Sequence, residues 1–181
     1  MIGLGRMGAN LVRRLMREGH RCVVHDVDAE AVEALVAEGA TGAHSIEELV
    51  AAPRGSPRRV DHGPRRLRGG VVEELAVLLE PGDVIVDGGN SYYRDDLDRA
   101  QRLRPSGIHY LDCGTSGGVW GLERGYCLMI GGDSDAVRRL EPIFATIAPG
   151  EGVPTRHRDA APAGPPRTAT CTAAPAVRAT S

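Results

Sequence analysis

Short apolar segments and amphipathic helical segments alternate along almost the whole chain. The apolar runs have the length and composition of buried strands and occupy residues 1–5, 21–26, 83–89, 108–114 and 126–132. Helical periodicity fills most of the space between them, at residues 6–20, 29–39, 45–52, 71–82, 92–104 and 133–148. Strands that alternate with helices build a parallel sheet covered on both faces. We therefore predict an α/β fold with a mostly parallel sheet.

Two of these helices carry clear end signals. The first places four apolar side chains on one face before a glycine stop at Gly19, namely Leu11, Val12, Leu15 and Met16. The third is predicted to begin after Ser45 as N-cap, with Glu48 three residues further on.

Residues 3–8 read GLGRMG and match G-x-G-x-x-G where the first strand meets the first helix. In this motif Gly3 permits a tight turn, Gly5 lets the backbone approach a pyrophosphate, and Gly8 lets the helix pack close to the strand. The diphosphate would lie at the helix N-terminus. An ordinary glycine turn has the same letters, so the residues that follow decide between the two.

Asp26 closes the second strand 18 residues after Gly8, near the roughly 20 residues expected for a carboxylate that binds the adenosine ribose. This spacing favours a Rossmann-like, doubly wound dinucleotide-binding domain, in which Arg6 and Met7 belong to the cofactor loop. A carboxylate repels a 2'-phosphate, and Asp28 adds a further negative charge, so NAD is predicted over NADP. A solvated acid at a strand end is the alternative for Asp26.

Length and charge limit the remaining possibilities. The 181 residues, 41% of them hydrophobic, allow one principal domain, which we assign to residues 1–149. The net charge of -2 gives no field that would favour nucleic acid or an anionic membrane. No apolar run reaches the roughly 20 residues that span a bilayer, so a cytoplasmic protein is expected. The four cysteines lack CxxC spacing, which predicts neither a metal site nor a disulfide framework.

Two later stretches place glycines and polar side chains after predicted strands. They are DGGNS at 87–91 and DCGTSGGVWGLERGYCLMIGG at 112–132. Loops at the carboxyl ends of parallel strands are where open sheets bind ligands, although Ser and Asn also serve as simple caps. Together with GLGRMGAN at the start, both stretches resemble decarboxylating 6-phosphogluconate dehydrogenase. The resemblance covers most of 1–52 and 71–149, and TSGGVWGLERG distinguishes that enzyme from other 3-hydroxyacid dehydrogenases.

The resemblance implies NAD-dependent oxidative decarboxylation of 6-phosphogluconate to ribulose 5-phosphate, a step of the pentose phosphate pathway. It implies that 6-phosphogluconate is contacted beside the nicotinamide by Asn90, Ser116, Gly117 and Gly118, with Glu123 as a further contact. Members of the family continue into a large helical domain that carries the proton-transferring lysine and glutamate and the homo-oligomer interface. No such domain is recognisable here, and the first strand is shorter than is usual in the family.

Residues 53–70 depart from the family, because an Arg-, Gly- and Pro-rich run stands where the fourth strand is expected. Read one base later, the degenerate codons for VDHGPRR permit Trp-Ile-Met-Val-Pro-Ala-Gly, which is similar to the family's strand. We interpret 53–70 as out of frame, with a basic, anion-binding insertion loop as the alternative. Losing a buried parallel strand predicts a protein of low stability.

The tail at 150–181 lacks apolar periodicity and is rich in Pro, Ala, Thr and Arg, so it is predicted to be disordered. Its last part also permits a family-like string in another frame. The chain contains no lysine, and arginine cannot replace lysine as a proton-transferring base. His109 is predicted to be a strand residue, and His157 lies in the tail. We therefore assign no catalytic residue and predict an inactive cofactor-binding part. The alternatives are a catalytically dead nucleotide-binding module and another 3-hydroxyacid dehydrogenase.

Overall fold

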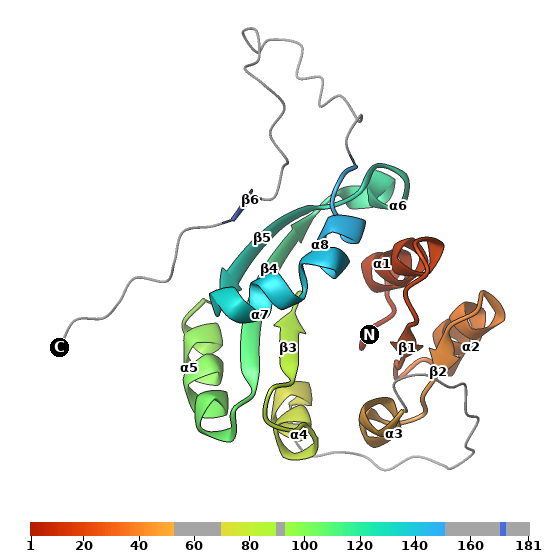
Figure 1. Cartoon of the computed structure of the whole chain (residues 1–181). Helices are drawn as coiled ribbons and strands as arrows, with labels where there is room; N and C mark the ends of the chain where they lie inside the picture. The colour runs from red at the N-terminus through yellow and green to blue at the C-terminus, as the bar shows by residue number, and fades with distance from the viewer. Residues whose placement is uncertain (53–69, 90–92, 151–170, 173–181) are drawn as a thin grey trace, which may run out of the picture.

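The structure, a computed structural model, describes residues 1–52, 70–89, 93–150 and 171–172 (Figure 1). Its helices are α1 Arg6–Arg17, α2 Ala29–Ala37, α3 Ile46–Ala51, α4 Val71–Leu78, α5 Tyr93–Leu103, α6 Gly121–Arg124, α7 Ser134–Arg139 and α8 Glu141–Ile147, with 3-10 turns η1 Arg104–Ser106 and η2 Gly118–Trp120. Its strands are β1 Val23–Val24, β2 Thr41–Gly42, β3 Val84–Asp87, β4 His109–Ser116, β5 Cys127–Gly132 and β6 Cys171–Thr172.

The described strands form two sheets. In the first, β1 pairs with β2 in parallel, and Ile2 adds a parallel bridge to His25. The second sheet has the order β3-β4-β5-β6, in which β3 and β4 are parallel and β5 is antiparallel to β4. No ladder joins the two sheets within the described residues. The predicted α/β class with a mostly parallel sheet is confirmed.

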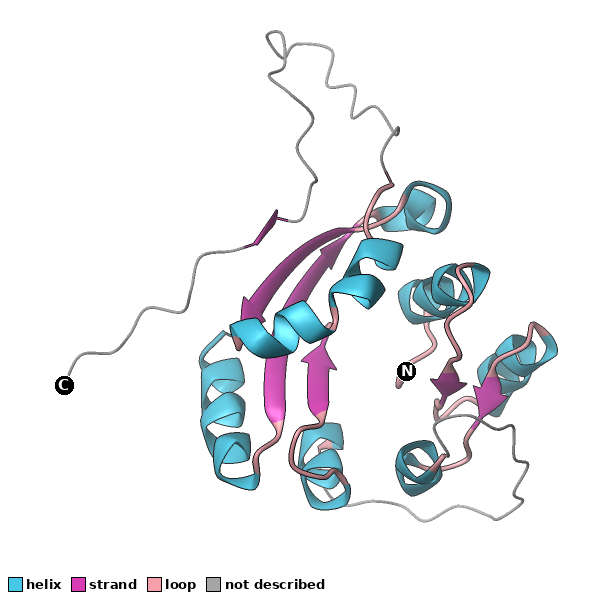
Figure 2. Ribbon diagram, in the orientation of Figure 1, coloured by secondary structure: helices cyan, strands magenta, loops and turns pink. Residues whose placement is uncertain are grey.

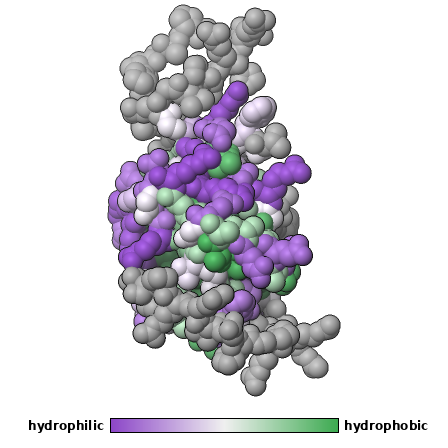
Figure 3. Space-filling model, turned by 90° about the vertical axis from the view of Figure 1, so that its right-hand side faces the viewer, coloured by the Kyte–Doolittle hydropathy of each residue, from purple (hydrophilic) through white to green (hydrophobic). Residues whose placement is uncertain are grey.

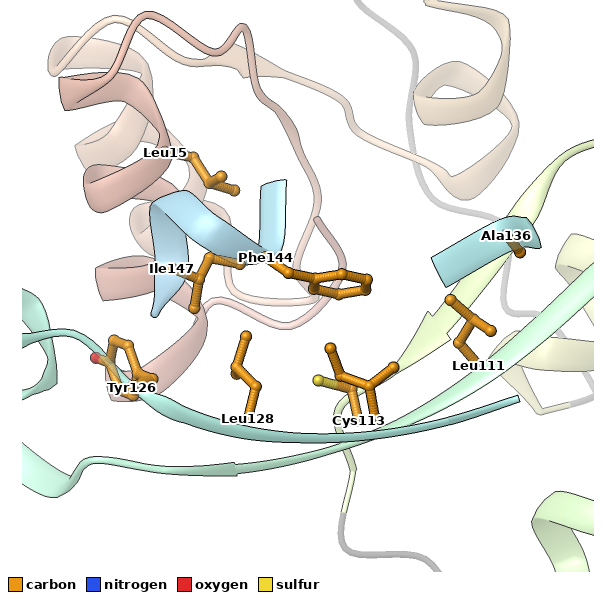
Figure 4. Close-up of a cluster of buried hydrophobic side chains, with 9 residues drawn as sticks. Leu15, Leu111, Cys113, Tyr126, Leu128, Ala136, Phe144 and Ile147 are labelled. Carbon is orange, nitrogen blue, oxygen red and sulfur yellow. The ribbon is translucent and has the colours of Figure 1, made fainter. Parts of the chain in front are cut away.

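Helices cover both faces of the larger sheet (Figure 2). On one face, Leu111 and Cys113 of β4 and Leu128 of β5 pack against Phe144 and Ile147 of α8 (Figure 4). On the other face lies a second apolar cluster, with side chains from α3, α4, β3, α5, the segment between η1 and β4, and β4 itself. Its buried residues are Ile46, Leu75, Ile85, Leu103, Ile108 and Tyr110. Neighbouring strand residues point to opposite faces, so Tyr110 and Leu111 of one strand serve different clusters.

Helix α1 joins the two sheets through neighbouring side chains of its apolar face. Val12 packs with Val24 and Leu35 in the cluster around β1 and α2, whereas Leu15 packs in the cluster under α8. Arg14 adds a polar link. Its Nε and Nη2 atoms donate to the carbonyl oxygens of Thr146 and Ala148, both at 2.7 Å, and its Nη1 donates to Leu122 at 3.3 Å. The guanidinium group thus bonds the unpaired carbonyls at the end of α8.

The structure differs from the expected elements at several places. The predicted first strand is a single bridge at Ile2, and β1 is shorter than 21–26. The predicted helix over 133–148 is wrong, because α7 ends at Arg139 and α8 begins anew with Pro142 in its first turn, where a missing N–H is tolerated. Strand β2 was not predicted, since Thr41–Gly42 has no apolar pattern. Strand β5 runs antiparallel because only η2 and α6 separate it from β4.

Two predictions fall mainly outside the described residues. Of the segment interpreted as out of frame, 53–69 lies outside them, and Gly70 is the N-cap of α4. Of the predicted disordered tail, 151–170 and 173–181 also lie outside them. Within that tail, β6 pairs with β5 in parallel, Met129 with Cys171 and Ile130 with Thr172.

The face shown in Figure 3, which is the side of α2 and β2, is mostly hydrophilic with a small apolar area near its middle. None of the helices in the described parts of the chain is long and apolar enough to cross a membrane.

We predict that Arg14→Ala lowers the free energy of unfolding by roughly 2 to 3 kcal/mol, because charge-assisted hydrogen bonds to several helix-end carbonyls are lost. Arg13→Ala is the matched control on the same helix. Arg13 pairs with Glu38 at 2.6 Å on the surface, and such pairs contribute about 0 to 1 kcal/mol. Urea unfolding of both variants measures the difference, and equal losses would contradict the role given to Arg14.

Candidate functional site: a glycine-rich loop and a second loop after β4

The glycine-rich loop has the geometry that its sequence predicts. Gly3 has a φ of 85°, a conformation that suits glycine. A Cβ atom on Gly8 would lie 2.0 Å from the Gly3 carbonyl oxygen, so only glycine permits this contact between helix and loop. A Cβ atom on Gly5 would meet nothing within 4 Å. The loop is therefore closed on the side of Gly8 and open beside Gly5.

The N-terminus of α1 suits a negatively charged ligand. Gly5 is the N-cap and provides no side-chain hydrogen bond, and the first turn contains no acidic residue. Every other α-helix in the described part of the chain has an acidic residue in its first turn. Free N–H groups and the helix dipole favour an anion at such an end. Arg6 and Met7, which follow Gly5, are both exposed.

Asp26 holds the glycine-rich loop against the end of β1. Its Oδ2 accepts a hydrogen bond from the Leu4 N–H, and its Oδ1 accepts one from the Asp28 N–H at 2.9 Å. The Leu4 bond, followed by the Asp28 bond, lowers the pKa of Asp26 below its ordinary value of 3.8. Asp26 is therefore ionised near neutral pH, and each carboxylate oxygen keeps a lone pair for another donor.

Asp28 lies beside Asp26 as the N-cap of α2, where its Oδ1 accepts from the Glu30 N–H at 3.1 Å. Two carboxylates thus lie two residues apart after β1. The loop, α1 and Asp26 fit a dinucleotide cofactor.

The second loop begins where β4 ends. Ser116 is exposed and pairs with Cys127 of β5 in the antiparallel ladder. Gly117 and Gly118 lead into η2, and Gly118 has a φ of 53°. The strand predicted from the sequence ends at Gly114, whereas β4 continues to Ser116. Ser116 is therefore the last residue of the strand.

Tyr126 lies beneath this second loop and was not predicted as a site residue. It is 0% exposed, and its N–H donates to the Ile147 carbonyl at 2.9 Å. Its hydroxyl has no hydrogen-bond partner among the described residues, and in Figure 4 it points away from the rest of the apolar cluster. Its ring lies in close contact with two glycines of the loop, Gly117 and Gly121. The sequence signal for this residue is therefore the spacing of these two glycines before a tyrosine.

A polar network lies at the end of β3, just before Asn90. Asn90 itself lies outside the described ranges. The Tyr110 hydroxyl lies 2.6 Å from Asp87 Oδ2 and 2.9 Å from Asp96 Oδ1, which share its one hydrogen, and Arg99 donates to Asp96 at 3.1 Å. Burial and the bond to Asp87 raise the pKa of Tyr110. Asp87 Oδ1 in turn accepts from the Gly89 N–H at 2.8 Å. The network fixes the start of the DGGNS stretch, and sequence reasoning missed it.

The structure brings Gly3, Gly5, Gly8 and Asp26 into one site. In the ranges that are described, no hydrogen bond or ion pair joins that site directly to the Ser116 loop. The connection is indirect, through α1, whose Arg14 bonds Leu122 of α6. Glu123, inferred as a further substrate contact, pairs with Arg17 at 3.4 Å on the surface. His109 lies on β4, 4.0 Å from Asp133, as expected for a strand residue.

A parallel sheet with a G-x-G-x-x-G loop closing onto α1 and an acid at the end of β1 defines a dinucleotide-binding domain of the Rossmann-like class. The sequence matches the family described as the NAD binding domain of 6-phosphogluconate dehydrogenase over residues 1–156. The chain belongs to this family, which is one of oxidoreductases.

Individual relatives agree with this assignment. The chain is 40% identical over 154 residues to the NAD(+)-dependent, decarboxylating 6-phosphogluconate dehydrogenase of Haloferax volcanii, covering 83% of this chain and 50% of that protein. It is 41% identical over 155 residues to the decarboxylating 6-phosphogluconate dehydrogenase of Treponema pallidum, covering 81% of this chain and 31% of the relative. The chain thus spans half or less of the length of these relatives.

A solved structure is similar in fold. The 6-phosphogluconate dehydrogenase of Plasmodium falciparum, described in complex with its cofactor NADP+ and with its substrate 6-phosphogluconate, matches with a TM-score of 0.69 and 25% identity. The match covers 83% of this chain and 34% of that chain. The predicted Rossmann-like fold is confirmed.

We predict that Gly5→Ala separates binding from stability. Alanine accepts the Gly5 φ of -56° and its Cβ meets open space. The free energy of unfolding should therefore change by less than about 1 kcal/mol, because the lower entropy of the unfolded chain with alanine offsets its weaker preference for an N-cap. The added methyl group would stand where a pyrophosphate approaches, so NAD affinity should fall at least about tenfold. Calorimetric titration and urea unfolding test both parts.

Gly131→Ala on β5, where a Cβ also meets nothing within 4 Å, is the control and should leave NAD affinity unchanged. Gly8→Ala should lower both stability and affinity, because its Cβ would overlap backbone. Unchanged NAD affinity in Gly5→Ala would contradict the assignment of this loop.

A pH dependence follows from Asp26. Its pKa is lowered in the folded chain, so its stabilising contribution is full above the unfolded value of 3.8 and is lost as the pH falls through the folded value. The stability difference between the wild type and Asp26→Asn should therefore be largest above about pH 5 and shrink toward acid. Urea unfolding as a function of pH measures it, and a difference that does not vary with pH would contradict the bonding of Asp26.

Proposed function

We propose that this chain is the cofactor-binding part of an NAD-linked, decarboxylating 6-phosphogluconate dehydrogenase, which converts 6-phosphogluconate to ribulose 5-phosphate in the pentose phosphate pathway. The observation that carries the proposal is the contact of Gly8 with the Gly3 carbonyl, which leaves Gly5 open at an uncapped helix end. Bound NAD would supply the hydride acceptor for the oxidation. The residues of this chain would bind and orient the two reactants.

The cofactor would be held by the residues of the first loop. The backbone around Gly3, Gly5 and Gly8, with Arg6 and Met7 in the first turn of α1, would bind the pyrophosphate. Asp26 would accept hydrogen bonds from the adenosine ribose. The succession of Asp26 and Asp28 favours NAD over NADP, because a 2'-phosphate would be repelled by both carboxylates.

The substrate would be contacted by Asn90, Ser116, Gly117 and Gly118. The exposed end of β4 at Ser116 and the polar network that fixes Asp87 before Asn90 support this assignment. The 6-phosphogluconate relatives named above support the substrate class.

We further propose one domain over residues 1–149 in a protein that acts in the cytoplasm. The run at 53–70 is rich in Arg, Gly and Pro, whereas a doubly wound sheet has an apolar strand at this point of the sequence. This composition supports the interpretation of 53–70 as out of frame. Resequencing the coding DNA tests it, and an intact single frame in an expressed gene would refute it.

Catalytic turnover is not expected from these 181 residues alone. They contain no lysine, and the ε-ammonium group of lysine is the one whose pKa burial brings toward neutrality. His109 lies beside Asp133, on the opposite side of β4 from Ser116 by strand alternation. Binding of cofactor without turnover is therefore the function proposed for the chain by itself.

The test uses the purified 181-residue chain. Titration should give a lower dissociation constant for NAD than for NADP, and Asp26→Asn should narrow the difference. No NADH should form from 6-phosphogluconate. Tighter binding of NADP would overturn the cofactor assignment. NADH formation that is lost in Ser116→Ala would overturn the expected inactivity, and it would support 6-phosphogluconate as the substrate.

A further inference from the structure

One aromatic ring lies against both ends of the turn that follows Ser116. A Cβ atom on Gly117 would stand 2.6 Å from Cδ1 of Tyr126, and one on Gly121 would stand 2.1 Å from its Cε1 and 2.2 Å from its Cζ. The same ring edge therefore runs from the residue before η2 to the residue after it. Neither glycine can carry a side chain while the ring stays in place.

The ring itself is held firmly. Tyr126 is fully buried in the cluster that includes Leu128 and Ile147 (Figure 4), and its backbone N–H bonds the Ile147 carbonyl at the end of α8. The preceding residue, Gly125, has a φ of 84° and lies so close to Ala148 and Pro149 that a Cβ would approach the Pro149 nitrogen to 2.5 Å. The turn before Tyr126 is thus pressed against the end of α8, which fixes the position of the ring.

We propose that Tyr126 is a positioning residue, whose ring holds Gly117 and Gly121 at a fixed separation and so places Ser116 and Gly118 for the substrate. The proposal rests on the substrate role given above to this loop. It assigns the role to the flat ring, because ring carbons make the contacts with both glycines. The hydroxyl group, which has no partner in the described residues, is not needed for it.

The ring and the hydroxyl can be separated by substitution. Tyr126→Phe keeps the ring edge, and it removes a buried hydroxyl that lacks a partner, so it should not lower stability. Tyr126→Leu remains apolar but loses the flat edge that spans the two glycines. Cys113→Ala, in the same apolar cluster and away from the loop, is the control for general loosening of the core.

Amide hydrogen exchange tests the proposal without any ligand. In Tyr126→Leu, exchange at residues 117–122 should become about tenfold faster or more, while exchange in α2 stays as in the wild type. Tyr126→Phe should match the wild type, and Cys113→Ala should not accelerate 117–122 selectively. Unchanged exchange at 117–122 in Tyr126→Leu, or an equal acceleration throughout the chain, would overturn the proposal.

Ligand titration then separates positioning from folding. Fluorescence of Trp120, the only tryptophan of the chain and 62% exposed in η2, can report 6-phosphogluconate at the loop. Tyr126→Leu should weaken the binding of 6-phosphogluconate about tenfold or more, and it should leave NAD affinity, measured by calorimetry, unchanged. Equal 6-phosphogluconate affinity in the wild type and in Tyr126→Leu would overturn the proposal. If the wild type binds no 6-phosphogluconate, the proposed substrate role fails, and hydrogen exchange still decides whether the ring holds the loop.

Discussion

The close contact between Gly8 and the Gly3 carbonyl is the constraint on which the cofactor site depends. It brings the first turn of α1 down onto the loop, so that Gly5 becomes an N-cap without a side chain and the helix N–H groups stay available. Asp26 reinforces this arrangement from the end of β1 by accepting the Leu4 N–H. A methyl group at Gly8 would push helix and loop apart, and it would separate the helix end from the acid that completes the site.

Helices hold the two described sheets together. Helix α1 contributes Val12 to one apolar cluster and Leu15 to another, and Arg14 bonds the end of α8. Helices α3 and α4 meet in the second cluster, on the face of the larger sheet opposite α8, and this cluster also contacts Ile2. Because hydrogen-bonded ladders do not join the sheets in the described ranges, these helix contacts connect the glycine-rich loop to the Ser116 loop. A change in α1 should therefore be felt at both.

Local chemistry made much of the fold and of the cofactor site predictable. The glycine motif, the spacing to Asp26 and the Ser45 cap are set by neighbours in the chain, and the structure contains the predicted bond from the Glu48 N–H to Ser45 Oγ at 3.1 Å. Features set by distant contacts were missed. Strand β2 depends on Gly42 fitting beneath Val36 of α2. The position of Tyr126 depends on contacts with α8, which follows later in the sequence. Pro142 was a local signal for a new helix start, but the apolar periodicity of 133–148 led to the prediction of one continuous helix.

The central claim is that the first turn of α1 and its loop bind the diphosphate of NAD. Backbone amide NMR of the chain during an NAD titration tests it most directly, because each N–H reports its own contacts. The account predicts saturable shifts centred on residues 3–8 and on Asp26, with pyrophosphate alone shifting the loop amides but not Asp26. Saturable shifts centred elsewhere, or none at residues 3–8 while the chain is folded, would contradict it.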